Sequence, residues 1–364
     1  MNYPRRFPLR ASAALTALFA LAVSAAPLRG VAAQESARRS SSGVNGKIAF
    51  QSTQGGDGFT NDIYVMDADG RRQTRLTDDP ADDVFGLWSP QGDRIAFLSS
   101  RRGAGYEIYL MNADGSSQRP LRDASPVKTD GFVWSPDGTR LAYVLGGNVY
   151  VVAADGTAAP VDVSVNKPAG STDGEPSWSP TGGQLVVRNS TPCGGCSDLH
   201  VVNASDGGGR IQLSTGPGFD AGPRWSPAGN LIAYEGDRSG RGIYVTAADG
   251  TGAETLVSGT VGSWGPAAWS PDGARLAFLA GLGDVYDVNA DGSQLTPVSD
   301  VRSSSGSVFW SPDATMVGFH NGNADGWVDI FVVSADGSSR RAANYTKTRR
   351  ADEFAYSWQK LATP

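Results

Sequence analysis

The sequence predicts an all-β fold: a seven-bladed β-propeller of four-stranded antiparallel blades, closed by pairing of its N- and C-terminal segments. One observation is a phrase opening with Trp-Ser-Pro that recurs six times, at Trp88, Trp134, Trp178, Trp225, Trp269 and Trp310. Another is an Asp-Gly turn that recurs seven times, at Gly70, Gly115, Gly156, Gly207, Gly250, Gly292 and Gly337. The Trp phrase repeats every 41–47 residues and the Asp-Gly turn every 41–51, about the length of one propeller blade.

Two strands are expected between these phrases in every repeat. The first follows the Trp phrase, as in Ile95-Ala-Phe and Leu141-Ala-Tyr, and the second precedes the Asp-Gly turn, as in Ile108-Tyr-Leu and Val149-Tyr-Val. Short β-branched and aromatic segments suit a sheet that is buried on both faces. The turn glycines supply the positive φ that tight hairpins need. The Trp is expected to fill the gap between blades, where Trp→Ala typically costs about 3–5 kcal/mol.

The chain ends predict how the ring closes. A seventh copy of the first strand, Ile48-Ala-Phe50, has no Trp phrase before it, and a seventh Trp, Trp358, has no strands after it. If the Trp phrase is the inner strand, the C-terminal segment completes the blade begun by the N-terminal one. Such a composite blade leaves no sheet edge exposed. The propeller is expected to span residues 46–359.

These phrases resemble those of the TolB-like, or WD-repeat-like, propellers. The resemblance rests on Trp-Ser-Pro-Asp-Gly (as at 134–138), Ile-Ala-Phe (as at 48–50) and Ile-Tyr-Val-Met-Asp-Ala-Asp-Gly (63–70). It implies a binding module of the cell envelope, because TolB is a periplasmic protein whose propeller docks a lipoprotein partner. The resemblance covers the propeller only, without the N-terminal α/β domain of TolB. Similar propellers also precede the catalytic domain of prolyl-oligopeptidase-like peptidases.

The first 33 residues have the pattern of a signal peptide. Arg5, Arg6 and Arg10 form a basic region, an apolar stretch runs from residue 11 to 26, and small residues precede a cleavage site before Gln34. The stretch is short for a transmembrane helix, and no later segment is apolar enough. Export to the periplasm or the medium is therefore expected. Residues 34–45 are interpreted as a flexible leader and 360–364 as a tail.

The charge balance argues against nucleic acid and anionic membranes as partners. The whole chain has 31 basic and 37 acidic residues, a net charge of −6. Four of the basic residues and no acid lie in the predicted signal peptide, so the mature chain has 27 against 37, or −10. An acidic protein repels polyanions. The expected partner is a protein, a peptide or a glycan, and the expected state is a monomer.

The sequence offers no catalytic residues. A Gly-x-Ser-x-Gly nucleophile turn does not occur, and the two histidines, His200 and His320, both fall in predicted strands. Two histidines are too few for the histidine cluster of metal-dependent lyase propellers. The interpretation is a protein that is not an enzyme and that has no cofactor or metal. The alternatives are a hydrolase or lyase that uses the channel, and a passive structural module.

Two local motifs are interpreted structurally. Cys193-Gly-Gly-Cys196 is expected to form a disulfide in an exported protein, with a redox pair and a zinc site that includes His200 as alternatives. The segment from Asn321 to Gly326 resembles the first half of a calcium loop. Its twelfth position is Val332, where a bidentate acid belongs.

The candidate binding site lies on what we call the variable face. The Ser-Pro-Asp-Gly and Ala-Asp-Gly turns share one face of the ring, and the loops of differing length and chemistry lie on the other, the variable face. Its predicted partner-binding residues are the acids that lead into inner strands and two loop tryptophans: Asp83, Asp130, Asp173, Asp220, Glu353, Trp264 and Trp327. Converging carboxylates favour a cationic ligand. The alternative is that each acid caps its own loop and that the tryptophans cover the core.

Overall fold

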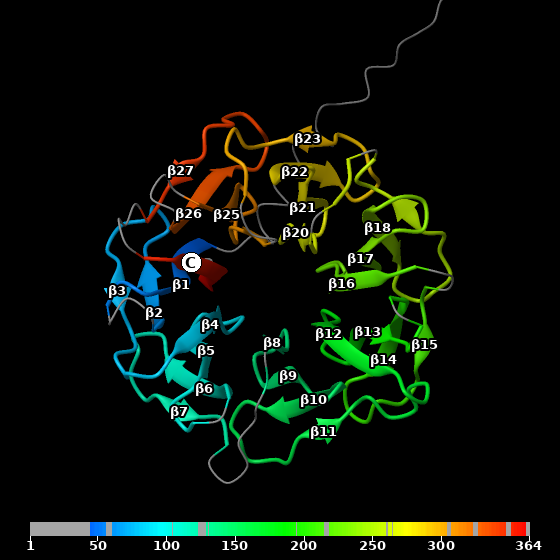
Figure 1. Cartoon of the computed structure of the whole chain (residues 1–364), viewed down its shortest axis with the longest axis horizontal. Helices are drawn as coiled ribbons and strands as arrows, with labels where there is room; N and C mark the ends of the chain where they lie inside the picture. The colour runs from blue at the N-terminus through cyan, green and yellow to red at the C-terminus, as the bar shows by residue number, and fades with distance from the viewer. Residues whose placement is uncertain are drawn as a thin grey trace, which may run out of the picture. The chain divides into compact units, whose positions relative to one another are not determined.

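The computed structural model describes residues 44–55, 60–103, 105–122, 129, 131–193, 195–214, 218–259, 261–263, 265–303, 307–322, 327–346 and 351–361. The predicted signal peptide, Asp130 and Trp264 lie outside these residues, as do residues 323–326 of the calcium-like loop. Among the described residues, every regular element is a β-strand. The strands form seven four-stranded antiparallel sheets arranged as a ring (Figure 1). The predicted fold class is confirmed.

Blade 1 is the composite one. Its strand order, from the inner strand outward, is β28 (Glu353–Leu361), β1 (Val44–Ser52), β2 (Asp62–Met66) and β3 (Thr74–Arg75). The predicted closure by pairing of the two chain ends is therefore confirmed. Val44 lies opposite Leu361 in this ladder. The strands thus extend two residues beyond the predicted propeller limits at each end.

Blades 2 to 7 each use four consecutive strands, with the Trp-phrase strand innermost. Blades 2 and 3 are β4 (Asp83–Trp88), β5 (Arg94–Ser99), β6 (Glu107–Asn112) and β7 (Arg119–Pro120), then β8 (Phe132–Trp134), β9 (Arg140–Leu145), β10 (Asn148–Ala153) and β11 (Val161–Asp162). Blades 4 and 5 are β12 (Thr172–Trp178), β13 (Gln184–Ser190), β14 (Ser197–Asn203) and β15 (Ile211–Gln212), then β16 (Asp220–Trp225), β17 (Leu231–Gly236), β18 (Gly242–Ala247) and β19 (Thr255–Leu256). Blades 6 and 7 are β20 (Ala268–Trp269), β21 (Arg275–Ala280), β22 (Asp284–Asn289) and β23 (Thr296–Pro297), then β24 (Val308–Trp310), β25 (Met316–Gly322), β26 (Val328–Ser334) and β27 (Ala343–Asn344).

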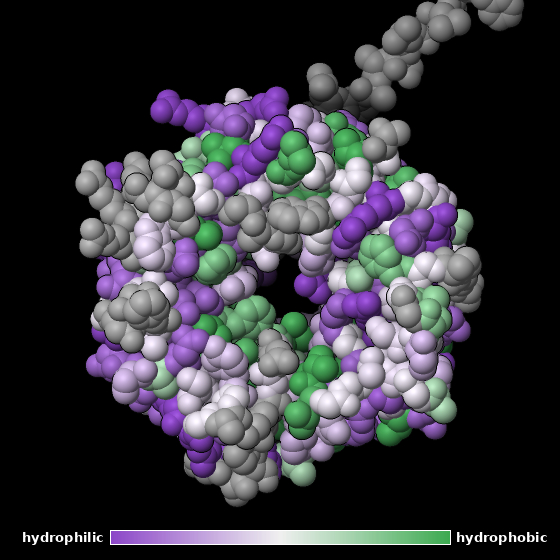
Figure 2. Space-filling view, viewed as in Figure 1, coloured by the Kyte–Doolittle hydropathy of each residue, from purple (hydrophilic) through white to green (hydrophobic). Residues whose placement is uncertain are grey.

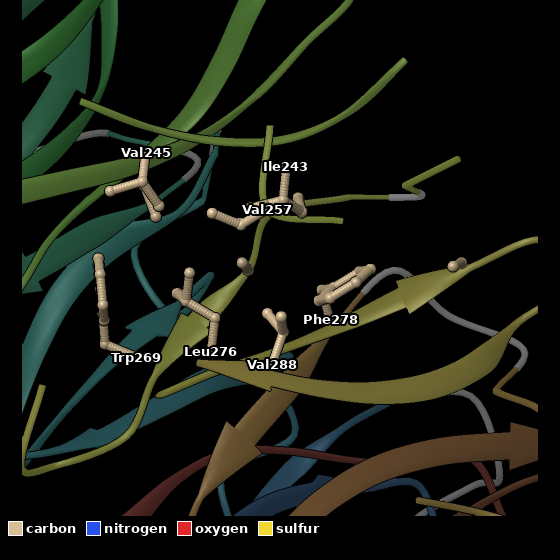
Figure 3. Packing of buried hydrophobic residues seen from close by; sticks show 10 residues of the cluster. Ile243, Val245, Val257, Trp269, Leu276, Phe278 and Val288 are labelled. Carbon is tan, nitrogen blue, oxygen red and sulfur yellow. The ribbon is translucent and has the colours of Figure 1, made fainter. Parts of the chain in front are cut away.

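The core consists of apolar layers between neighbouring blades. One layer joins Ile243 and Val245 of blade 5 to Trp269, Leu276 and Phe278 of blade 6 (Figure 3). The indole of Trp269 is 9% exposed, and its Nε1 donates to the carbonyl of residue 224 in the preceding blade at 2.9 Å. The Trp134, Trp178 and Trp310 indoles donate in the same way to the inner strand of the blade before them. In blades 3, 4, 6 and 7 the repeated Trp therefore packs between blades and also connects adjacent inner strands by a hydrogen bond.

The Ser-Pro-Asp-Gly phrase and its variants form a turn after the inner strand in blades 2 to 7. In blade 3 the Ser135 Oγ accepts a hydrogen bond from the Arg140 N–H at 2.9 Å and donates to the Asp137 carboxylate at 2.6 Å. Gly138 follows with a φ of 64°, a conformation that costs glycine little. The turn satisfies its own polar groups, which explains why it varies little between blades. It also reverses the chain into the second strand.

Candidate functional site

A large hollow lies at the variable-face end of the central channel. It is a cavity of roughly 810 Å³ lined by inner strands and by turns between second and third strands, with Phe85, Tyr106, Phe132, Leu145, Glu175 and Arg224 among the lining residues. In the space-filling view, the centre of the ring is open, and hydrophobic atoms gather on part of its rim (Figure 2). A volume of this size is typical of sites that bind a small ligand or a short peptide segment.

β-Bulges in three inner strands shape the rim of this cavity. The pairing register shifts after Val84 in β4, after Gly174 in β12 and after Ala221 in β16. The bulged residues Phe85 and Glu175 have φ values of 58° and 50°, which are uncommon for residues other than glycine. Such strained positions persist only where the surroundings hold them, and they gather at ligand sites.

Side chains of the preceding blade hold two of these bulges. The Phe85 N–H donates to the Gln51 Oε1 at 3.0 Å, and the Gly222 N–H donates to the Glu175 Oε2 at 2.6 Å. The other Glu175 oxygen accepts from the Arg188 guanidinium at 2.9 Å. Side-chain hydrogen bonds therefore join neighbouring blades at the rim, and the Glu175 carboxylate is already paired with Arg188.

Below the rim, the channel narrows to a second cavity of about 460 Å³. Most of its wall is apolar, including Leu87, Val133, Ala268 and Phe309 from four inner strands. Arg224 lines both this cavity and the larger one above it. Arg224 was not among the residues predicted from the sequence. Comparing the residue just before each repeated Trp would have identified it as the charged member of that set.

The four predicted acids that the structure describes line neither of these two cavities. The side chains of Asp83, Asp173 and Asp220 are at most 1% exposed, and each forms an ion pair with an arginine of its own blade: Arg101 at 2.6 Å, Arg210, and Arg238 at 2.5 Å, respectively. Glu353 is also fully buried. Burial raises the pKa of the Asp83 and Asp220 carboxyls, and their arginines oppose that shift. The arginines, which are far from the acids in sequence, were not predicted.

The other predicted site residues are less informative. Trp327 is partly exposed and directly precedes β26 on the variable face, while Asp130 and Trp264 lie outside the described residues. A partner-binding role for the acids and the tryptophans stays a prediction. Cys193 and Cys196 form the predicted disulfide in the loop between β13 and β14.

Both histidines lie inside strands. His200 in β14 is 6% exposed and His320 in β25 is 1% exposed, and burial lowers the pKa of each imidazole to about 4. The Nε2 of His320 accepts a hydrogen bond from the Ala355 N–H in β28 at 2.9 Å. His320 therefore connects blade 7 to the inner strand of blade 1. Across the described part of the chain, histidine, cysteine and acidic side chains do not gather in groups of three with metal-site geometry.

Acidification is expected to destabilise the protein through His320. The pKa of its imidazole is about 4 in the folded protein against an ordinary value of 6.5, so between these values the unfolded chain binds the proton and stability falls as pH falls. A shift of this size corresponds to about 3 kcal/mol. Urea unfolding at pH 7 and pH 4.5 should show a pH-dependent loss about 2 kcal/mol larger for the wild type than for His320→Asn. Equal losses in the two proteins would contradict this assignment.

Comparison with known proteins shows that part of the propeller is similar to TolB. The profile of the TolB beta propeller domain matches residues 104–261. The Tol-Pal system protein TolB of Bordetella pertussis is 31% identical over 172 residues, which make up 46% of this chain and 37% of TolB. The chain thus matches little more than a third of that relative's length. The described residues include no helix that is both long and apolar enough to cross a membrane.

Solved structures share the architecture at low identity. A puromycin-hydrolysing peptidase of Mycobacterium tuberculosis superposes with a TM-score of 0.63 at 17% identity, over 85% of this chain and 54% of the peptidase. An oligogalacturonate lyase in complex with manganese superposes with a TM-score of 0.61 at 16% identity, over 84% of this chain and 86% of the lyase. These two likenesses concern the fold alone. The chain is a β-propeller protein. Residues 104–261 of its propeller are similar to the TolB propeller domain, in agreement with the resemblance of the repeated phrases.

Proposed function

We propose that this protein is exported and acts in the periplasm or outside the cell as a binding module for a protein, a peptide or a glycan. The observation that carries the proposal is the cavity of roughly 810 Å³ on the variable face. Its wall combines aromatic and aliphatic side chains with few polar groups, the composition of binding pockets. The signal-peptide pattern supports export, and the similarity to the Tol-Pal system protein TolB supports a role in the cell envelope.

An activity of the peptidase or lyase kind is the alternative. The two structural neighbours carry such names, but their likeness extends to the fold only. Fold does not determine function, which depends on the side chains of the site. The described histidines lie inside strands, and neither lines one of the two cavities. The binding module is therefore the function that the geometry supports best.

Blocking the cavity should abolish partner capture. Ala221 lines the cavity at the start of β16, so Ala221→Trp would fill it. Ala253 is exposed between β18 and β19 on the opposite face, and Ala253→Trp is the matched control. With the proteins immobilised and exposed to envelope extract, the Ala221 variant should retain less than a tenth of the partner that the wild type and the control retain.

Two results would contradict the proposal. One is full partner capture by a folded Ala221→Trp variant, because the site would then lie elsewhere. The other is cleavage of a peptide or an oligogalacturonate by the purified wild-type protein. Circular dichroism and thermal melting would verify that both variants are folded.

A further inference from the structure

The residues directly before the repeated tryptophans reveal one exceptional position in the channel. They are Leu87, Val133, Ser177, Arg224, Ala268, Phe309 and Ser357. All of them except Ser357 line the second cavity, the one below the rim. Six of these seven side chains are uncharged, and blade 5 alone carries a charge. Because the blades repeat one structure, the other six serve as internal references for what the ring requires at this position. A cation here is not needed to build the blade.

The Arg224 side chain is without an acidic partner among the residues that the structure describes. Its Nη1 donates a hydrogen bond to the carbonyl of Pro223 at 3.1 Å. The two acids of the cavity wall are occupied, since Glu175 pairs with Arg188 at 2.9 Å and Glu235 pairs with Arg241 at 2.8 Å. The three arginines and two glutamates together have a net charge of +1. Burial lowers the pKa of the Arg224 guanidinium and the charge of Glu175 opposes the shift. The group stays charged at neutral pH.

A partly buried charge is costly unless an opposite charge joins it. The cavity therefore favours an anion, although the chain as a whole has a net charge of −6. A single guanidinium matches a single carboxylate, to which it can donate two parallel hydrogen bonds. A polyphosphate would leave most of its charge without a partner. The surrounding wall, with Phe85, Phe132 and Leu145, offers apolar contacts to whatever flanks the anion.

We propose that the cavity binds a peptide segment whose Asp or Glu side chain reaches down to Arg224 while apolar residues on either side pack against the rim. This proposal rests on the binding function proposed above and specifies its ligand. An acidic side chain fits this position better than a C-terminal carboxylate. A chain end would have to carry its backbone into the apolar channel, where N–H and C=O groups find few partners. A side chain brings only methylene groups and the carboxylate.

The test is direct binding of defined peptides. The probe is an array of acetylated and amidated heptapeptides whose central residue is Glu or Gln and whose four flanking positions vary among Ala, Val, Leu, Phe and Pro. A third set has Gln at the centre and a free C-terminus. The wild type should bind its best Glu peptides at least tenfold more tightly than their Gln twins. Arg224→Met should reduce that preference to less than twofold.

Arg302→Met is the matched control, because Arg302 is 59% exposed and pairs with Asp284 at 3.2 Å. It should keep the preference for Glu. The backbone of residue 224 still accepts the Trp269 indole in the Arg224 variant, so both variants should melt like the wild type.

Several outcomes would overturn the inference. They are no binding of Glu peptides, a Glu preference that survives in Arg224→Met, a preference for the free C-terminus, and tighter binding of trigalacturonate than of any peptide. The proposed function is judged separately. If Ala221→Trp abolishes partner capture while wild-type protein shows no Glu preference, the binding module stands and the acidic ligand is wrong.

Discussion

Deleting residues 351–364 is expected to abolish cooperative folding or to lower the melting temperature by about 15 °C or more. The deletion removes β28, the inner strand of blade 1. Trp358 is 7% exposed and Ala355 fully buried, so their apolar contacts are lost together. Loss of one buried Trp alone costs about 3–5 kcal/mol, a large share of a stability of about 5–15 kcal/mol.

The same strand holds its neighbours on both sides. The Ser357 Oγ accepts from the Trp88 N–H of blade 2 at 2.9 Å, and the Gln359 side chain donates to the Gly92 carbonyl at 2.7 Å. On the other side, Ala355 donates to His320 of blade 7. Without β28, β1 also becomes an exposed edge that promotes aggregation. Thermal circular dichroism and size-exclusion chromatography would measure both effects.

Deletion of residues 362–364 alone is the matched control, since β28 ends at Leu361. It should melt with the full-length protein. A protein truncated at Ala351 that melts within a few degrees of the full-length protein would show that the ring does not depend on this strand.

The fold could be predicted because each blade repeats local chemistry. A Trp that fills the space between blades, a Ser that caps its own turn and a Gly at positive φ act within about ten residues of one another. Their order in the sequence therefore reports the order of the strands. The composite blade followed from phase alone, because Trp358 has no strands after it and Ile48 has no Trp before it.

The site was harder to predict because it depends on contacts between distant residues. Asp173 was recognised as a repeated acid before an inner strand, yet its partner Arg210 lies 37 residues away on the far side of the blade. The repeated sequence pattern gives no indication of this ion pair, so the sequence predicts Asp173 at the channel mouth. Arg224 was missed for the opposite reason. It departs from the repeat, whereas the prediction relied on what the repeats share.

The β-bulges also could not be predicted from the sequence, because they too depend on contacts between distant residues. Phe85 and Glu175 take up positive φ although neither is a residue that favours it. Their conformation is set by the register of pairing with the next strand and by side chains of the preceding blade, such as Gln51. Local sequence carries no signal for such a position.

Asp173→Asn is expected to destabilise the protein by about 3–5 kcal/mol, the usual cost of removing one partner of a buried ion pair. The side chains of Asp173 and Arg210 are 1% and 10% exposed. Within the described residues, the Arg210 Nε and Nη1 atoms are buried without hydrogen-bond partners, so the guanidinium relies on this carboxylate. Asparagine keeps the shape of the side chain but leaves the charge of Arg210 uncompensated.

Three variants separate charge burial from a general loss of contacts at this position. Asp284→Asn removes a carboxylate that is 40% exposed and pairs with Arg302, and exposed pairs contribute about 0–1 kcal/mol. Adding Arg210→Met to Asp173→Asn should recover much of the lost stability, because it removes the buried charge itself. Urea unfolding at pH 7 gives the free energies. If Asp173→Asn costs no more than Asp284→Asn, the acid does not hold the blade together. Its predicted role in binding a partner would then become the better explanation.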